Sequence, residues 1–193
     1  MLKQLGLAIR ITLFFTILTG LIYPGVVTGL CQLLFRHKAN GSLVMVNGQA
    51  VGSSLIGQNF TEPEYFQPRP SAAGNDGYEP TASAGSNYGP TNQKLIDRVK
   101  ASVEKFRKDN QDYTAPIPAD LVTASASGLD PDLSPGAAAA QAARVGKARG
   151  TTIEKIQALI DQHKKERQLG FLGEPRVNVL ELNLALDRAF RRH

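Results

Sequence analysis

Three histidines are the side chains best suited to metal binding or proton transfer in this chain, at positions 37, 163 and 193. A metal site needs several such ligands at a spacing that brings them to one centre. His37 adjoins a long apolar run, His163 lies in a lysine-rich stretch, and His193 ends the chain. None has a second ligand at a useful spacing. The sequence therefore predicts no metal site, and we expect His163 to be a solvated helix residue.

The sequence patterns of common catalytic machineries are also absent. There is no G-x-S-x-G nucleophile elbow and no Walker A phosphate-binding loop. The stretch from Gly146 to Gly150, GKARG, only partly matches such a loop and fits the end of a helix better. The Asp-Lys-Thr-Gly sequence that P-type pumps phosphorylate does not occur either. We therefore expect no catalytic residues in this chain.

An apolar run of 25 residues without a charge, from Ile11 to Phe35, dominates the first fifth of the chain. A helix rises about 1.5 Å per residue, so this length spans the roughly 30 Å hydrocarbon core of a bilayer. A cleaved signal peptide has a shorter core and a small-residue cleavage site. A lipoprotein site would need a small residue before Cys31, where Leu30 stands. We predict a retained transmembrane helix at 11–35, between a terminal segment at 1–10 and a soluble domain at 39–193.

The net charge of +5 arises next to this apolar run. Four basic residues flank the run, and from Ala39 onward 18 basic residues face 17 acidic ones. This distribution is typical of a membrane-flanking segment and not of a surface that binds phosphates. We therefore expect no nucleic-acid partner. Cys31 is the only cysteine, so the chain can form no internal disulfide and no thiolate metal site.

Small residues recur along the predicted transmembrane helix. Gly25 and Gly29 form a G-x-x-x-G pattern, and Thr16 and Gly20 repeat its spacing. Small residues let a second helix approach closely in lipid, so this pattern predicts a packing face for a partner helix. Glycine is also common in membrane helices without such a role. Pro24 is expected to bend or locally loosen the helix.

The orientation of the helix is weakly indicated by charge. Two basic residues precede the apolar run and two follow it, so the positive-inside rule hardly decides. Between Ala39 and Gln93, however, the only basic residue is Arg69. A segment so poor in basic residues fits the outer side of the membrane. We expect a cytoplasmic N-terminus and an extracytoplasmic domain.

The soluble part mixes strand and helix signals. Asn47-Gly48 between two apolar runs predicts a β-hairpin whose second strand ends near Ile56. Thr151 to Glu154 has the pattern of a helix capping box. The residue patterns predict four helices and one further strand: helices at 91–110, from 134 onward, at 151–165 and at 184–190, and a strand at 175–182. Strands and helices do not alternate strictly, so we predict an α+β fold.

No helix or strand pattern appears between Gly57 and Pro90, where 10 of 34 residues are Gly or Pro. The same stretch holds 5 of the chain's 13 aromatic residues. Disordered linkers are poor in aromatic residues because they bury nothing. We therefore expect a packed functional loop. Its aromatic side chains can either fix the loop to its own domain or build a binding surface.

Five long segments, taken in order, resemble one known family. They are GSSLIGQNF (52–60), YFQPRPSAAG (65–74), SAGSNYGPTNQKL (83–95), SGLDPDLSPGAAAAQAARV (127–145) and GEPRVNVLELNLALD (173–187). Together with the single N-terminal span, they resemble the C subunit of the bacterial Kdp-type potassium-transporting ATPase over essentially the whole chain. One departure is Asp132, because the family usually carries histidine there. No role is therefore assigned to that side chain.

The resemblance implies a non-catalytic accessory subunit of a high-affinity, ATP-driven potassium uptake complex in the bacterial inner membrane. It implies three partners: a channel-like subunit that selects potassium, a P-type ATPase subunit that is phosphorylated, and a very small single-span subunit. Potassium and ATP are then handled by the complex, and we expect no cofactor on this chain. The loop 69–90 is interpreted as a surface for a partner, with the candidates Arg69, Ser71, Tyr78, Ser83, Ser86 and Asn87. Each of these could instead serve internal turns or packing.

The resemblance also implies that the subunit raises the ATP affinity of the pump as a catalytic chaperone. The expected extracytoplasmic position of the domain indicates instead an outer cap near the ion entrance, or an assembly clamp that acts through the membrane helix. The stretch from Leu55 to Gln58, LIGQ, partly matches the LSGGQ signature by which ABC ATPases contact nucleotide, so Gln58 is the candidate nucleotide contact. ATP is cytoplasmic, however, and an extracytoplasmic domain cannot reach it. The alternative outside the family is a membrane-tethered binding module or enzyme unrelated to transport.

Overall fold

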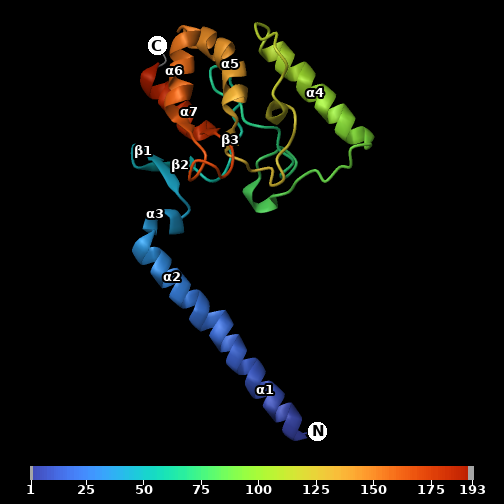
Figure 1. Cartoon of the computed structure of the whole chain (residues 1–193), viewed down its shortest axis with the longest axis vertical. Helices are drawn as coiled ribbons and strands as arrows, with labels where there is room; N and C mark the ends of the chain where they lie inside the picture. Colours follow the sequence, from blue (N-terminus) through green and yellow to red (C-terminus); the bar gives the residue numbers. More distant parts are fainter. Residues whose placement is uncertain (1, 191–193) are drawn as a thin grey trace. The chain divides into compact units, whose positions relative to one another are not determined.

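The computed structural model describes residues 2–190, so His193 lies outside the described residues. The chain divides into two compact units, residues 1–51 and residues 52–193. Figure 1 shows the helices and strands of both units, coloured along the chain.

The first unit begins with a continuous apolar helix. It consists of α1 (Leu2–Ile17), a π-helical turn (Leu18–Ile22) and α2 (Tyr23–Leu34). Within residues 2–190, the helix Lys3–Leu34 is the one that is long and apolar enough to cross a membrane. Its large apolar side chains are exposed, as those of a lipid-facing helix must be.

The π-helical turn lies directly before Pro24. Proline has no N–H to donate to a carbonyl one turn earlier in the helix. The N–H of Tyr23 bonds to the carbonyl of Leu18, five residues back instead of four. The loosening expected at Pro24 is confirmed, and it takes the form of one residue inserted into the helix.

This inserted residue changes which small residues share a face. An α-helix turns about 100° per residue, so Gly20 and Gly25 would lie about 140° apart in an uninterrupted helix. One extra residue in the π-helical turn reduces that angle to about 40°. The pair Thr16 and Gly20 therefore lines up with the pair Gly25 and Gly29 along one face. A Cβ atom added at any of these three glycines would meet no other atom within 4 Å, so the face is open.

A short helix, α3 (Arg36–Ala39), and a β-hairpin follow. The hairpin strands are β1 (Leu43–Val46) and β2 (Gln49–Ser53). Asn47 and Gly48 have φ angles of 51° and 80°, which confirms the predicted turn. The second strand ends at Ser53 and not near Ile56. The reason is that Ser53 Oγ accepts from the N–H of Leu55 and starts a turn.

In the second unit, three helices pack around a small sheet. They are α5 (Pro135–Ala148), α6 (Ile153–His163) and α7 (Val179–Ala189), grouped together in Figure 1. The alanine-rich face of α5 lets α6 approach closely, because alanine side chains are small. The core contains one aromatic and several aliphatic side chains that are fully buried, among them Phe66, Leu133, Val145, Ile156, Ile160, Val177, Leu182 and Leu186.

The sheet has three short antiparallel strands in the order β3-β5-β4. They are β3 (Asp132–Leu133), β5 (Arg176–Asn178) and β4 (Lys164–Lys165). Neighbouring strands are paired antiparallel and are not linked by strict β-α-β crossovers. The predicted α+β class is therefore confirmed.

Helix boundaries follow their capping residues. Helix α4 (Gln93–Asp109) lies between Asn92, whose side chain accepts from the N–H of Lys94, and Asn110, as predicted. Ser134 Oγ accepts from the N–H of Ala137 and caps α5, also as predicted.

Two helix predictions need correction. The predicted capping box at Thr151 is not formed, because Thr152 is the N-cap of α6 and its side chain makes no capping bond. Helix α6 ends at His163 and not at Lys165, because Lys164 and Lys165 pair with β5. His163 is half-buried, with Nδ1 3.0 Å from the carbonyl oxygen of Leu159.

The strand predicted at 175–182 is mostly wrong. Only Arg176–Asn178 is a strand, and helix α7 starts at Val179. The side chain of Asn178 accepts from the N–H of Glu181 and so starts the helix. Beyond Asn178, the buried residues Val179, Leu182 and Leu186 follow a helical period instead of alternating.

Candidate functional site

The loop 69–90 and the segment 124–131 are far apart in the sequence but pack against each other within the second unit. Three side chains of the loop reach the segment. Arg69 Nη1 donates to Asp130 Oδ2 at 2.7 Å, Ser71 Oγ to the carbonyl of Gly128 at 2.6 Å, and Ser83 Oγ to the carbonyl of Ser127 at 3.0 Å. The loop is therefore an ordered surface and not a slack linker.

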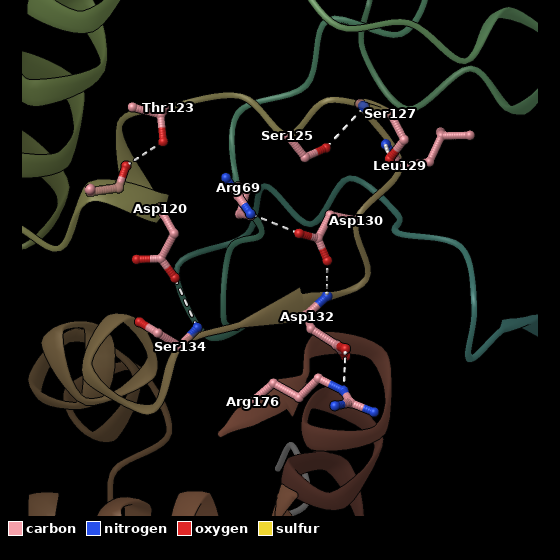
Figure 2. Close-up of polar contacts among 12 residues, drawn as sticks. Arg69, Asp120, Thr123, Ser125, Ser127, Leu129, Asp130, Asp132, Ser134 and Arg176 are labelled. Carbon is pink, nitrogen blue, oxygen red and sulfur yellow. Dashed lines mark hydrogen bonds and ion pairs between the residues drawn. The ribbon is translucent and has the colours of Figure 1, made fainter. Parts of the chain in front are cut away.

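Arg69 and Asp130 form the ion pair of this surface (Figure 2). Both side chains are partly exposed. The second carboxylate oxygen of Asp130 accepts from the N–H of Asp132 at 3.0 Å, which fixes the carboxylate in the turn. Arg69 is thus held by a carboxylate that is itself held by the backbone.

Tyr78 is the aromatic anchor of the loop. Its hydroxyl donates to the carbonyl of Arg69 at 2.6 Å, and its N–H donates to Ser71 Oγ at 2.8 Å. Burial, with a smaller contribution from Asp130, raises the pKa of the Tyr78 hydroxyl well above its ordinary value. The hydroxyl therefore stays protonated and remains a hydrogen-bond donor.

Close backbone approach holds the two segments together. Gly128 has a φ angle of 68°, and a Cβ atom there would lie 2.7 Å from the backbone nitrogen of Ala73. Only glycine fits such a position without a shift of the loop. A side chain at position 128 would therefore push the loop off the segment.

Residues 86–88, near the end of the loop, contact helix α4. Arg98 Nη2 donates to Ser86 Oγ at 3.1 Å, and its guanidinium lies 5.6 Å from the centre of the Tyr88 ring. Asn87, between them, has a φ angle of 50°, a left-handed conformation that asparagine tolerates better than most residues. Tyr88 keeps part of its ring exposed.

A second charged pair lies on the neighbouring sheet. Asp132 Oδ2 is 2.9 Å from Arg176 Nε, and Asp132 Oδ1 accepts from Asn178 Nδ2 at 3.1 Å. Burial raises the pKa of the Asp132 carboxyl, and the favourable contacts with Asn178 and Arg176 offset this only in part. Figure 2 shows that Arg69, Asp130, Asp132 and Arg176 follow one another along this region.

Gln58 precedes the loop 69–90 in the sequence, and its side chain contacts β2. Its side-chain amide occupies the space that a Cβ atom would take at Gly52, so it packs on the backbone there. The N–H of Gly57 donates to the carbonyl of Leu129 at 2.8 Å. The stretch that resembles a nucleotide signature thus has a structural role at the end of β2. Nucleotide contact by Gln58 stays a prediction.

Two hollows border the loop. A cavity of about 270 Å³ lies beside Arg69, Tyr78 and Lys105, and a more open groove of about 630 Å³ runs along Leu55, Arg69 and 124–131. Arg69 lines both. In the part of the chain that the structure describes, no cluster of three or more metal-ligating side chains occurs.

Among the described residues of the second unit, Arg144 is the one buried residue that carries a charge, and it was not selected from the sequence. Its guanidinium bonds to Asn110 Oδ1 at 2.9 Å, to Gln141 Oε1 at 2.6 Å, and to the carbonyls of Pro63 and Tyr65. Burial lowers its pKa to about 10, so it stays charged at neutral pH. Arg144 thereby links residues 63–65, which precede the loop 69–90, to α5.

The sequence predicted an ordered loop, but it did not predict which residues of the same chain hold the loop in place. Asp130 lies in the segment 127–145, which served only to mark a resemblance. Its position directly before Pro131 and two residues after Gly128 is a turn signal that predicts an ordered acid. The six predicted partner contacts, Arg69, Ser71, Tyr78, Ser83, Ser86 and Asn87, all lie in the ordered loop. Of these, four side chains bond within the domain, and Ser86 receives a bond from Arg98. Binding of a partner by these residues stays a prediction.

An apolar helix of membrane-spanning length, joined to an α+β unit with an ordered loop surface, is typical of a single-span membrane protein with one domain outside the bilayer core. The family model of the K+-transporting ATPase c chain matches residues 5–188. The chain is 56% identical over 184 residues to the potassium-transporting ATPase KdpC subunit of Myxococcus xanthus, which covers 95% of this chain and 87% of the relative.

Two further relatives carry the same name. The subunit of Koribacter versatilis is 52% identical over 185 residues, with 96% and 94% of the two chains covered. That of Gemmatimonas aurantiaca is 54% identical over 187 residues, with 97% and 94% covered. The chain therefore belongs to the family of K+-transporting ATPase c chains. It is an accessory subunit of that ATPase, and the catalytic activity lies on another chain.

Proposed function

We propose that this subunit acts from the outer face of the bacterial inner membrane as an assembly clamp and cap of the potassium uptake complex. The observation that carries the proposal is the preformed loop 69–90, pinned by Arg69–Asp130 and by Ser71 and Ser83. A surface that is already ordered loses little conformational entropy when a partner binds. A rigid loop of this kind suits a permanent contact in a complex.

The proposed partners are the channel-like subunit that selects potassium, the P-type ATPase subunit that is phosphorylated, and the small single-span subunit. The loop surface would meet a partner outside the membrane. The face formed by Thr16, Gly20, Gly25 and Gly29 would pack against a partner helix within it. Contacts at both levels would give this chain, for which no catalytic residues are predicted, a role in holding the complex together.

The proposed orientation places the N-terminus in the cytoplasm and the second unit outside. Its support is the scarcity of basic residues between Ala39 and Gln93. In this orientation ATP cannot reach Gln58. Any increase in the ATP affinity of the catalytic subunit would then pass through the membrane helix or through assembly. A Gln58→Ala change should leave ATP affinity unchanged, whereas a nucleotide contact would make it fall.

Two matched substitutions test whether Arg69 contacts a partner directly. Arg69→Ala removes both the ion pair and any partner contact. Asp130→Asn removes the ion pair but keeps the guanidinium. If Arg69 binds a partner, Arg69→Ala should reduce co-purification of the other subunits and potassium uptake at low potassium more than Asp130→Asn does. Arg107→Ala, at an exposed position on α4, is the control.

Equal losses from both substitutions would assign Arg69 an internal role in shaping the loop. An intact complex with normal uptake in both would remove the loop ion pair from the proposed interface. Circular dichroism of each purified chain checks that the fold is kept.

A further inference from the structure

The loop 167–174 joins β4 to β5 and exposes three large apolar side chains at its tip. Leu169, Phe171 and Leu172 are 83%, 69% and 47% exposed. The other exposed large apolar residues described in the second unit occur singly or as one adjacent pair: Leu55, Ile56, Tyr88, Ile96 and Ile153. Clustered exposed apolar side chains mark sites of contact with proteins or membranes.

The tip is held in a fixed shape by its own backbone. Gln168 and Leu172 exchange two backbone hydrogen bonds, each of 2.9 Å. An ion pair of 2.6 Å between Arg167 and Glu174 closes the base of the loop. Leu169 has a φ angle of 52°, a conformation uncommon for a leucine. The fold thus holds apolar side chains outward in a turn where polar residues or glycine would fit more easily.

The charged residues that flank the tip pair with acidic ones. From Lys164 to Arg176 the chain has four basic residues and two acidic ones. All four basic side chains form ion pairs, with Glu166, Glu181, Glu174 and Asp132. The flanks are therefore close to neutral, and contact of the tip with its surroundings depends on its apolar side chains.

We propose that the apolar tip of loop 167–174 inserts into the boundary between headgroups and acyl chains of the membrane. The chain supplies its own reason for a bilayer nearby, because the second unit is covalently joined to a membrane-spanning helix. Such a tether raises the effective concentration of the surface, so a small insertion suffices. The inference does not depend on the orientation proposed above, because both faces of a bilayer present headgroups.

The test uses the full chain in lipid nanodiscs that contain anionic lipid. Cys31→Ser removes the only cysteine. A nitroxide label is then attached at Phe171→Cys or, as a control, at Ile153→Cys on α6, where the side chain is 50% exposed. Collision rates of the label with oxygen, which dissolves in lipid, and with a nickel chelate, which stays in water, report its depth. We expect the label at 171 to lie about 5 Å or more below the headgroup level and the label at 153 to lie in water.

A second variant checks that the apolar tip drives the insertion. Leu169→Asp adds a charge at a position whose left-handed backbone aspartate tolerates better than leucine, so folding should be kept. It should move the label at 171 toward water. The same measurements are made on the assembled complex, with the labelled chain added before assembly.

Three outcomes decide the proposal. Oxygen contact at 171 that is lost with Leu169→Asp supports insertion into lipid. Nickel contact at 171 equal to that at 153, in both the chain and the complex, overturns it. Low rates with both reagents, appearing only in the complex, also overturn it and assign the tip to another subunit.

Discussion

Arg144 shows how one buried side chain organises the approach to the loop surface. Its acceptors in the described part of the chain are all neutral oxygens, from α5, from the end of α4 and from the carbonyls of residues 63 and 65. A charge buried in this way is kept because it satisfies backbone groups that would otherwise be unpaired. The residue acts as a structural tie between helix and loop.

Arg144→Met should therefore destabilise the second unit by about 3 kcal/mol, because it replaces the apolar part of the side chain but leaves several buried acceptors unpaired. The free energy of unfolding can be measured by urea titration of the full chain in detergent, followed by circular dichroism. Arg107→Met, at an exposed position, is the matched control and should change stability by less than about 0.5 kcal/mol. A loss at Arg144 no larger than at Arg107 would contradict the structural role.

Asp132 gives a prediction about pH. Burial raises its pKa in the folded chain, so the folded state holds this proton more tightly than the unfolded state does. The resulting stabilisation is complete below the unfolded pKa, about 3.9, and is lost as pH rises through the folded pKa. Asp132→Asn cannot titrate. The free energy of unfolding of the natural chain, relative to that of Asp132→Asn, should fall as pH rises from about 4 to about 7.

Urea titrations at several pH values check this trend, and Asp112→Asn, on the exposed surface, is the comparison. A difference between the natural chain and Asp132→Asn that grows with pH would show that the ion pair with Arg176 outweighs burial.

At the scale of elements, residue patterns correctly predicted the helix and hairpin boundaries that are set by side chains next to them. Asn92, Ser134 and the Asn47-Gly48 turn bound α4, α5 and the hairpin, because each acts through its own neighbouring backbone. The strand predicted at 175–182 failed because Asn178 both ends β5 and caps α7. Only pairing with β3 and β4 decides that the residues before it form a strand. The partners of Arg69 were equally unpredictable, because Asp130 lies 61 residues away in sequence.

The π-helical turn leads to a prediction about packing of the membrane helix. Because it aligns Gly25 and Gly29 with Thr16 and Gly20, a bulky residue on this face should block a partner helix. A Cβ atom at position 29 would meet no atom within 4 Å outside the neighbouring backbone of the helix, so the Gly29→Leu chain should still insert into the membrane. Co-purification of the other subunits in mild detergent should fall. Val27→Leu, about 160° around the helix from both Gly25 and Gly29, is the control and should leave co-purification unchanged.

Undiminished co-purification with Gly29→Leu would mean that these glycines do not face a partner helix. Loss of the chain from the membrane fraction would show a defect in insertion instead, and it too would count against the packing role.

At the scale of the whole molecule, the two units have different structural roles. The first unit supplies a helix of membrane-spanning length, and the second supplies an ordered α+β surface. The family assignment explains why neither contains catalytic chemistry, because that activity lies on another chain of the ATPase. The proposal that the second unit works outside the membrane rests on the distribution of basic residues and on the family resemblance, and the choice between capping and nucleotide contact depends on it.

The side of the membrane on which the second unit lies should therefore be determined first. In a Cys31→Ser chain, Ala158→Cys places one thiol on the exposed surface of α6, with little change in side-chain size. Intact cells are treated with a membrane-impermeant maleimide, with and without lysis. We expect labelling without lysis, which would place the second unit outside and exclude direct contact with ATP. Labelling only after lysis would contradict the account and make Gln58 the residue to test for nucleotide binding.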